Sequence, residues 1–325
     1  MQIIDGFTHL LPRTVYDKLV EVHPTEELLG FDEGTFLWDL DKRFTDMDDL
    51  GIDKQVTMLA LPSLWRGIDH DVAPEAVRFA NDEVSRIASE HADRLIPVGT
   101  LPLLGEEYED EFDRCIDDLG MAGIQIFANV DGQPIDSPEF RWIFDRAEAE
   151  GVALWLHPQL TDWYEWDGLY LLNKILGWPF DTSMAMSRLV FSGVMDDYPD
   201  LQFVVHHMGA MIPHFVDRLQ TFYQHTVEHL GQYPDRGFSE LSEPLRDAYR
   251  RFNVDTAVSG SAATFHCSYD YYGVDNVVFG TDYPFGPEMG RLWVKQIPDL
   301  IDNAEDISDE DRERLYHGNI ESLIS

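Results

Sequence analysis

The chain has 325 residues, and its 61 Asp and Glu against 23 Lys and Arg give a formal net charge of −38. Hydrophobic residues make up 44% of the chain and aromatic residues 12%, which is enough for a packed core, so the charge does not indicate disorder. Because nucleic acids and anionic membranes bind positively charged surfaces, we exclude both as electrostatic partners.

The surface implied by this charge is acidic and poor in lysine. Only five lysines occur, and the acids are dispersed along the chain rather than gathered in one tail. Such a surface predicts a halophilic protein, because repulsion among its charges is screened at molar salt. Stability that rises with KCl would support this prediction, and an ordinary acidic bacterial enzyme is the alternative.

The first residues, MQIIDGFTHLL, carry Asp5 and His9 within an apolar stretch and contain neither a basic leader nor an Ala-x-Ala-like cleavage site. No run reaches the length of about 18 apolar residues that a membrane helix needs. We therefore expect a soluble, cytoplasmic protein.

Eight short apolar runs predict strands at residues 2–7, 55–61, 95–101, 123–127, 152–156, 201–205, 252–254 and 276–279. Apolar residues at helical spacing predict helices at residues 74–91, 138–150, 183–196, 212–229 and 287–301. This alternation of strand and helix indicates that the strands pair in parallel. Because there are eight strands and no break in composition, we expect a single α/β domain over residues 1–325. Its expected fold is a (β/α)8 barrel of the TIM type. No GxGxxG or P-loop motif occurs, which argues against an open nucleotide-binding sheet.

Two connections, at about residues 10–53 and 158–182, are longer than a barrel requires. Both follow predicted strands and emerge at the mouth where barrel enzymes hold their sites, so we expect them to cover the site. The second is rich in aromatic residues, namely Trp163, Tyr164, Trp166, Tyr170 and Trp178. These side chains either roof a pocket or form a small satellite core beneath the loop.

Polar side chains follow four of the eight predicted strands. His9 follows the first, His157 ends the fifth, His206 and His207 end the sixth, and Asp282 ends the eighth. The carboxyl ends of parallel barrel strands meet at one mouth. Imidazole and carboxylate ligands hold Zn²⁺, Mn²⁺ or Fe²⁺ and leave positions open for water and substrate. The four strand ends together therefore predict a mononuclear catalytic site, although one such histidine alone would indicate only a core or loop residue.

Side chains alternate between the two faces of a strand, so Asp5, Phe7 and His9 are expected to point the same way, into the barrel if His9 does. Phe7 then occupies an interior position two residues before the expected ligand, and an apolar ring cannot bind a metal. By the same alternation, only one of His206 and His207 can point inward.

Motifs spread over nearly the whole chain carry a resemblance to a known family. They are IDGFTH (4–9), MDDLGIDKQV (47–56), Asn81, ADRLIPVGTLPL (92–103), GIQIFANVDGQPID (123–136), WLHP (155–158), HHMGAMIP (206–213), FGTDYPFG (279–286) and HGNIESL (317–323). In order and approximate spacing they resemble the amidohydrolase superfamily, in the branch that includes aminocarboxymuconate semialdehyde decarboxylase and related aromatic acid decarboxylases.

The resemblance implies a role for each residue at the strand ends. His9, His157 and Asp282 correspond to ligands of one divalent metal ion, with Zn²⁺ expected in preference to Mn²⁺ or Fe²⁺. His207 corresponds to the histidine that hydrogen-bonds the metal water, which makes His207 and Asp282 the expected catalytic residues. His206 precedes the family's seven-residue motif and is an extra neighbour.

The chain departs from the family at Phe7. The family's opening motif, IDxHxH, has a histidine at this position, and related decarboxylases with Glu-x-His still supply a ligand there. Three protein ligands and water suffice for catalytic zinc, so the chain can still bind the metal without a ligand at position 7. Its affinity for the metal should nevertheless be lower. Either Asp5 or His207 could serve as a fourth ligand, and a chain without metal or activity, a ligand-binding barrel, is the remaining alternative.

The resemblance implies a decarboxylase of an aromatic or unsaturated carboxylic acid, with a hydrolase of a lactone, amide or related bond as the alternative, because both reactions use one set of residues. Arg43, Trp163 and Phe7 are the expected substrate-binding residues, and Arg43 is placed to hold a carboxylate. A surface arginine paired with Asp39 or Asp46 is the alternative for Arg43. The expected partner molecule is a small carboxylate, and relatives suggest a homodimer.

Overall fold

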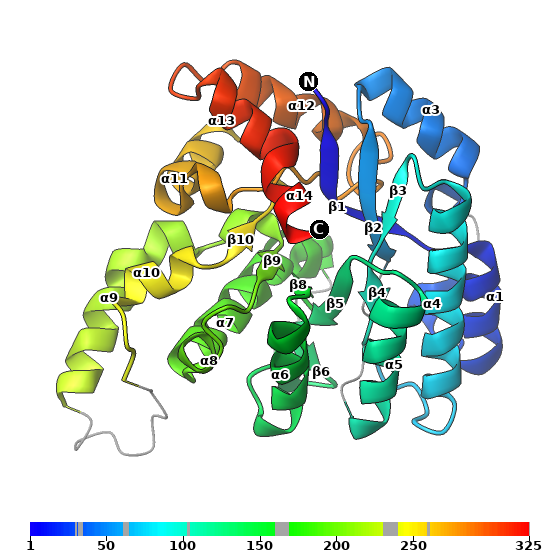
Figure 1. Cartoon of the computed structure of the whole chain (residues 1–325), viewed down its shortest axis with the longest axis horizontal. Helices are drawn as coiled ribbons and strands as arrows, with labels where there is room; N and C mark the ends of the chain where they lie inside the picture. Colours follow the sequence, from blue (N-terminus) through cyan, green and yellow to red (C-terminus); the bar gives the residue numbers. More distant parts are fainter. Residues whose placement is uncertain are drawn as a thin grey trace.

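A computed structural model describes residues 1–29, 31, 35–60, 65–102, 105–159, 169–229, 240–258 and 261–324. Figure 1 shows strands at the centre with helices around them. The strands are β1 (Ile4–Leu10), β2 (Lys54–Leu59), β3 (Leu95–Pro97), β4 (Gly99–Thr100), β5 (Gly123–Phe127), β6 (Asn129–Val130), β7 (Gln133–Pro134), β8 (Ala153–His157), β9 (Phe203–Val205) and β10 (Asn253–Val254). The α-helices are α1 (Arg13–Val22), α2 (Glu26–Leu29), α3 (Leu40–Leu50), α4 (Ala73–Glu90), α5 (Glu109–Asp113), α6 (Arg141–Glu150), α7 (Trp178–Phe191), α8 (Val194–Asp197), α9 (Ile212–Glu228), α10 (Leu245–Arg250), α11 (Ala262–Tyr272), α12 (Arg291–Asp302), α13 (Asp309–Glu313) and α14 (Asn319–Leu323).

The strands pair in parallel around a barrel, apart from the antiparallel hairpin of β6 and β7. One sheet has the order β1-β2-β3 and the other β10-β9-β8-β5-β4. Backbone bonds join the two sheets at β3 and β4, which the residue Val98 separates, and its N–H donates to the carbonyl O of Thr57 at 3.0 Å. Pairing through successive neighbours therefore carries the sheet from β1 round to β10.

Residues 277–279 close the barrel between β10 and β1. Val277 forms an isolated parallel bridge with Val254, and the N–H of Gly6 donates to the carbonyl O of Phe279 at 2.7 Å. The predicted (β/α)8 arrangement is therefore confirmed, and seven of its strands carry regular pairing. The eighth predicted run differs because it makes only scattered backbone bonds and no regular ladder.

Apolar side chains fill two layers, one inside the barrel and one between the strands and the helices. The inner cluster comprises Ile4, Phe7, Val56, Met58, Val98, Ala153, Trp155, Val204, Val278 and Ile320. Ile320 lies on α14, and Leu323 and Ile324 also pack against this cluster. Helix α14 therefore closes the barrel at the amino-terminal ends of its strands, opposite the end that β1 reaches at Leu10.

The first long connection differs from the loop that the sequence predicts, because residues 11–53 contain α1, α2, a short 3-10 turn and α3. Helix α3 begins where the carboxylate of Asp39 accepts the N–H of Lys42 at 2.9 Å, and it ends at Gly51, whose φ is +73°. In the second long connection, Trp163 lies outside the described residues, and α7 begins at Trp178, five residues earlier than predicted. None of the described helices is both long and apolar enough to span a membrane.

Candidate functional site

Four of the predicted side chains lie together at the carboxyl ends of the barrel strands. Nε2 of His9 lies 3.3 Å from Oδ1 of Asp282, and Nε2 of His206 lies 3.5 Å from the same oxygen. The ring centre of His157 is 5.2 Å from that of His9 and 5.6 Å from that of His206. The mouth of the barrel thus gathers imidazole and carboxylate groups from β1, β8, β9 and the segment after residue 279.

Backbone contacts between the two ends of the chain hold His9 and Asp282 in place. The N–H of Asp282 donates to the carbonyl O of Phe7 at 3.0 Å, and the N–H of His9 donates to that of Tyr283 at 2.8 Å. Asp282 also has a left-handed φ of +65°, which a non-glycine residue adopts only where its surroundings enforce it. This part of the site is therefore fixed by barrel closure.

Asp5 is held by the residue that precedes Asp282. Its carboxylate accepts the backbone N–H of Thr281 at 3.0 Å and the hydroxyl of Thr281 at 2.5 Å. Burial raises the pKa of Asp5 to about 7. Asp5 therefore fastens β1 to the strand end beside it, and a role as a metal ligand would require these bonds to break.

Phe7 is fully buried at the centre of the site. Its ring stacks on that of His206, with a centroid separation of 4.3 Å and planes 15° apart. The strict alternation predicted for β1 is interrupted, since its pairing with β2 shifts register between Asp5 and Thr8. Asp5 therefore bonds to Thr281, while Phe7 and His9 lie among the histidines, their ring centres 5.6 Å apart.

Both histidines at the end of β9 are close to the site. His206 donates from Nδ1 to the carboxylate of Asp255, and Nδ1 of His207 lies 3.3 Å from the hydroxyl oxygen of Thr182. Their ring centres are only 3.9 Å apart. The expectation that only one of the two can face the site is wrong here, because β9 ends at Val205 and alternation ends with it.

The turn after β9 has an unusual backbone. His207, Met208, Gly209 and Ala210 have φ angles of +62°, +52°, +70° and +51°, and only one of them is glycine. A left-handed conformation costs roughly 1–2 kcal/mol for a residue with a Cβ. Such strain is often found at functional sites, and here it brings the His207 ring back beside His206.

The carboxylates of the site favour a positive charge between them. Burial by itself would lower the pKa of His206, but Asp255 and Asp282 raise it to about 10. Burial would likewise raise the pKa of Asp282, but His206 and His9 hold it well below its usual value. For His157 and His207, burial and the neighbouring imidazoles lower the pKa well below the ordinary value.

The donor set suits a divalent metal ion in its chemistry. His9 is fully buried, and apart from the approach to Asp282 neither of its ring nitrogens has a hydrogen-bond partner. Burying an imidazole without partners for its nitrogens destabilises the fold unless a bound ligand or metal ion contacts them. Nδ1 of His157 lies 2.6 Å from the carbonyl O of Pro158 and donates its hydrogen there, which leaves the lone pair of Nε2 free to bind a metal ion. Within the described parts of the chain, no three His, Cys, Asp or Glu side chains stand close enough to enclose an ion, so the ligand set stays a prediction.

Arg43 lies on α3 behind the site and is 1% exposed, so it is not the surface arginine of the alternative interpretation. It donates to Oε1 of Gln55 at 2.7 Å and to the carbonyl O of His9, and its guanidinium lies 5.0 Å from the ring centre of Tyr283. Arg43 thus holds the carboxyl-terminal end of β1 through its hydrogen bond to His9. The role of substrate anchor stays a prediction.

Aromatic rings surround the predicted ligands. Phe285 has its ring centre 5.6 Å from that of His9, and Trp178 has its ring centre 6.1 Å from that of His157. Among the aromatic residues expected after β8, Tyr170 is 83% exposed, and Trp163 lies outside the described residues. Among the described residues, the aromatic rings beside the histidines thus include Trp178, Phe285 and Phe7, and also Phe127, whose ring centre is 6.0 Å from that of His157.

Sequence reasoning missed Asp255 and Thr182. Asp255 directly follows the predicted strand at residues 252–254, so the criterion that found Asp282, a polar residue after an apolar run, also applies to it. Thr182 is the fifth residue of α7, and no motif marks it.

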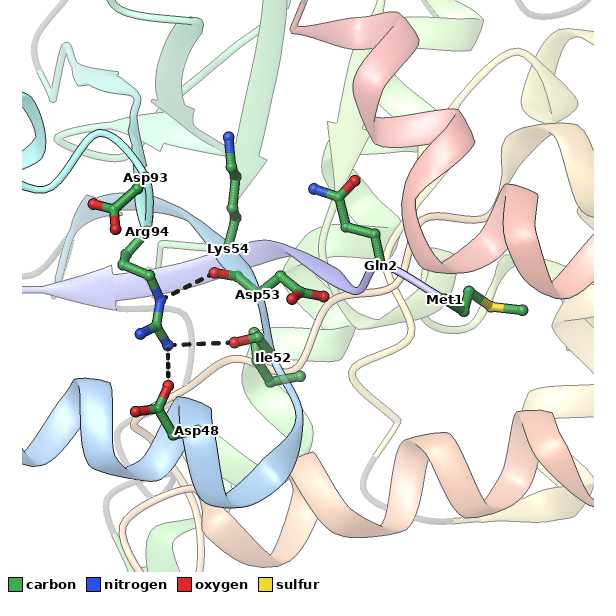
Figure 2. Close-up of a pocket in the computed structure, with 8 residues that line it drawn as sticks. All are labelled: Met1, Gln2, Asp48, Ile52, Asp53, Lys54, Asp93 and Arg94. Atoms are coloured by element: carbon green, nitrogen blue, oxygen red, sulfur yellow. Dashed lines mark hydrogen bonds and ion pairs between the residues drawn. The ribbon is translucent and has the colours of Figure 1, made fainter.

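A hollow of about 590 Å³ lies at the opposite end of the barrel. Figure 2 shows its lining of Met1, Gln2, Asp48, Ile52, Asp53, Lys54, Asp93 and Arg94. Arg94 pairs with Asp48 at 2.8 Å and donates to the carbonyl O of Asp53 at 3.1 Å. Arg94 is thus partnered, and among the described lining residues no buried polar side-chain atom lacks a hydrogen-bond partner, unlike at the mouth.

Comparison with known proteins gives matches along nearly the whole chain. The family described as amidohydrolase (Amidohydro_2) matches residues 4–324. The 2-amino-3-carboxymuconate-6-semialdehyde decarboxylase of Dictyostelium discoideum is 30% identical, over 97% of this chain and 89% of its own length.

Solved structures give the same fold. The 5-carboxyvanillate decarboxylase of Sphingomonas paucimobilis has a TM-score of 0.86 at 24% identity, covering 99% of this chain and 98% of that one. The 5-carboxyvanillate decarboxylase of Novosphingobium aromaticivorans, complexed with manganese and 4-hydroxy-3-methoxy-5-nitrobenzoic acid, has a TM-score of 0.85 at 24% identity, covering 99% and 96%. The relatives named are decarboxylases, and one of them binds manganese together with an aromatic acid.

Proposed function

This chain belongs to the amidohydrolase family Amidohydro_2, and on that premise we propose that it is a divalent-metal-dependent carboxy-lyase acting on an aromatic or unsaturated carboxylic acid. The observation that carries the proposal is the cluster of His9, His157 and Asp282 at the barrel mouth, where a fully buried imidazole lacks hydrogen-bond partners beside an ionised carboxylate. The decarboxylase relatives support the reaction type.

In this proposal His9, His157 and Asp282 hold the ion. When bound, a divalent ion polarises and orients a substrate oxygen as a Lewis acid. Zn²⁺ remains our first expectation from the ligand types, although the relative's structure contains manganese and makes Mn²⁺ the natural comparison.

His207 is the proposed proton carrier. In decarboxylation the bond to the carboxyl carbon breaks, its electron pair stays on the substrate carbon, CO2 leaves, and that carbon takes a proton. Because burial and the neighbouring imidazoles lower the pKa of His207 well below its ordinary value, the ring is neutral near pH 7 and first takes up a proton from solvent water. It then passes this proton on readily, since the protonated ring is a stronger acid than an exposed imidazolium.

The aromatic walls support a planar substrate. Trp178 and Phe285 flank His157 and His9, and Phe7 covers the floor, so a flat ring would find apolar faces around a polar centre. With a net charge of −38, a carboxylate approaches against long-range repulsion, and the proposed activity should therefore rise with salt. A homodimer, as the resemblance implies, is also part of the proposal.

The test uses the full chain, purified without chelator, with its metals measured by mass spectrometry. It is then incubated with dihydroxybenzoates and muconate semialdehydes while CO2 is recorded. We expect CO2 from at least one acid, loss of activity after EDTA treatment, and recovery with MnCl2 or ZnCl2. His157→Ala is the negative control, because it removes one proposed ligand. Turnover of a lactone panel without CO2 from any acid would assign the alternative hydrolase reaction instead.

A further inference from the structure

The chain lacks a donor at position 7 and has an additional histidine at position 206. Phe7 stands where a second metal-binding side chain of β1 would be, and its ring lies flat against that of His206 at 4.3 Å. The ring of His206 therefore covers the apolar side chain at the position where the donor is missing. His206 is itself only 1% exposed.

The position of the ring nitrogens of His206 suits coordination. Two atoms that bind one ion at about 2.1 Å lie about 3 to 3.5 Å apart. Oδ1 of Asp282 has this separation from Nε2 of His9, at 3.3 Å, and from Nε2 of His206, at 3.5 Å. The two histidines thus approach the same carboxylate oxygen in the same way, from different strands.

Asp255 holds His206 in this orientation. One of its oxygens accepts the N–H groups of Met208 at 3.1 Å and Ala257 at 3.0 Å, and the other accepts Nδ1–H of His206. The carboxylate is fully buried and cannot turn away without losing these bonds. Histidines that bind metals commonly donate their second ring N–H to a carboxylate or a backbone carbonyl, and His157 shows the same pattern with Pro158.

The other two candidates for a fourth ligand lack one or both of these features. Both oxygens of Asp5 accept from Thr281. Nδ1 of His207 faces a neutral hydroxyl on α7 rather than a carboxylate. Of the groups near Phe7 in the described part of the chain, His206 alone combines a carboxylate behind the ring with an Nε2 atom beside Asp282.

We propose that His206 is the fourth protein ligand of the divalent ion, replacing the donor that Phe7 removes, and that Asp255 is its positioning residue. The inference rests on the proposed metal site and deepens it. The site exchanges a ligand on β1 for one at the end of β9, with the proton of the neutral ring on Nδ1 and the lone pair on Nε2.

The test measures MnCl2 binding to the metal-free full chain by calorimetry, without substrate. His206→Gln should raise the Kd about 10- to 100-fold, and Asp255→Asn should raise it about 10-fold, since outer partners of ligands typically contribute this much. Asp255→Asn is informative because the amide oxygen can still accept from Met208 and Ala257, whereas its NH2 opposes Nδ1–H of His206. The matched control is Glu111→Gln, a buried carboxylate bonded to Asn81 and Arg114 on the outer helices, which should leave Kd unchanged.

A ligand exchange makes the test stricter. In the His206→Gln background, Phe7→His should restore the Kd to within about threefold of wild type, because the donor returns at its β1 position. A His206→Gln variant that binds Mn²⁺ like wild type would overturn the proposal, and so would a double variant that binds no better than the single one.

A measurement on the unsubstituted protein decides the matter even if a variant fails to fold. Pulsed electron paramagnetic resonance of bound Mn²⁺, with ¹⁵N-labelled histidine, should show three coupled imidazoles. Two coupled imidazoles, or no Mn²⁺ binding at all, would overturn the proposal. Because no substrate is present, failure of the carboxy-lyase reaction leaves this result standing, and CO2 release with only two coupled imidazoles would refute the ligand assignment alone.

Discussion

The two ends of the barrel use charged side chains in opposite ways. At the amino-terminal end, the hollow of about 590 Å³ is open, and its main cation, Arg94, pairs with Asp48, whose side chain is 69% exposed. At the carboxyl-terminal end, His9 and Asp282 are buried, their contacts are incomplete, and the backbone near them is strained.

This difference shows that an open hollow lined by charged side chains is not by itself a sign of chemistry. Charges that are solvated and paired contribute little, whereas buried donors without partners are retained only where something else offsets their cost. The site is therefore recognised by unsatisfied imidazole, an ionised buried carboxylate and left-handed non-glycine residues. Four predictions, two of them with a matched control substitution, test this contrast between the two ends.

The largest effect is expected at Asp282. Asp282→Asn removes the charge that faces His9 and His206, so kcat should fall about 1,000-fold, within the range for loss of a group that acts on the reacting atoms. Steady-state kinetics on the acid that wild type decarboxylates provide the measurement. Asp48→Asn, at the other end, should change kcat less than about twofold, because its pair is largely solvated. An equal fall in kcat in the two variants would contradict the conclusion that only the carboxyl-terminal end of the barrel carries the chemistry.

Asp181 should reveal a dependence of stability on pH at the site end. Burial raises the pKa of its carboxyl to about 7, and the backbone N–H of Gln159 donates to it at 2.7 Å. Because the folded-state pKa exceeds the unfolded value of about 3.9, this group's contribution to the free energy of unfolding is complete below pH 4 and is lost as the pH rises to about 7.

Asp181→Asn should therefore gain stability relative to wild type across that window, by about 4 kcal/mol at pH 8 compared with pH 4. Urea unfolding at a series of pH values measures the difference. A difference between the two proteins that stays constant with pH would show that the carboxyl titrates normally.

Gly280 tests the packing beneath the site. A Cβ at this position would lie 2.9 Å from Cβ of Asp255 and 3.1 Å from Cβ of Phe7, so Gly280→Ala should destabilise the fold by about 2 kcal/mol. Gly318, next to α14 at the opposite end, has its nearest neighbouring atom 3.7 Å away, and Gly318→Ala should be neutral or stabilising by about 0.5 kcal/mol. Thermal melting compares the two, and a Gly280→Ala protein as stable as wild type would contradict the close approach.

The smallest effect is expected at Arg94. Arg94→Ala should reduce the free energy of unfolding by less than about 1 kcal/mol, and this loss should shrink further in 1 M KCl, where exposed pairs are screened. Denaturant unfolding at low and high salt measures it. A loss of several kcal/mol would mean that the amino-terminal end depends on its charges as strongly as the mouth does.

The sequence was sufficient for the barrel and for the strand ends that meet at its mouth. All eight predicted strands fall on barrel positions, because apolar runs of this length have few other ways to bury themselves between helices. His9, His157 and Asp282 could be grouped in advance, since parallel strands place their carboxyl ends together.

The remaining details depend on geometry that no local pattern encodes. The alternation that ranked His207 above His206 fails at a left-handed turn, and the partner of His206, Asp255, lies 49 positions away after a strand of only two residues. The bonds of Asp5 to Thr281 span 276 positions. The first long connection was predicted as a loop, although α1 and α3 within it have 10 and 11 residues, and α1 buries Val15, Tyr16 and Leu19 on one face.

The apolar interior joins the beginning of the chain to its last helix, and this has a consequence for synthesis. Phe7 and Ile320 belong to one cluster, and β1 also bonds to the segment around residue 279. At about 5–20 residues per second, a ribosome needs roughly 15 to 60 s to proceed from the first of these to the last. During this interval the strand that carries His9 has no completed barrel to enter. Of the barrel strands, β1 therefore stays exposed for the longest time and depends most on shielding by a chaperone.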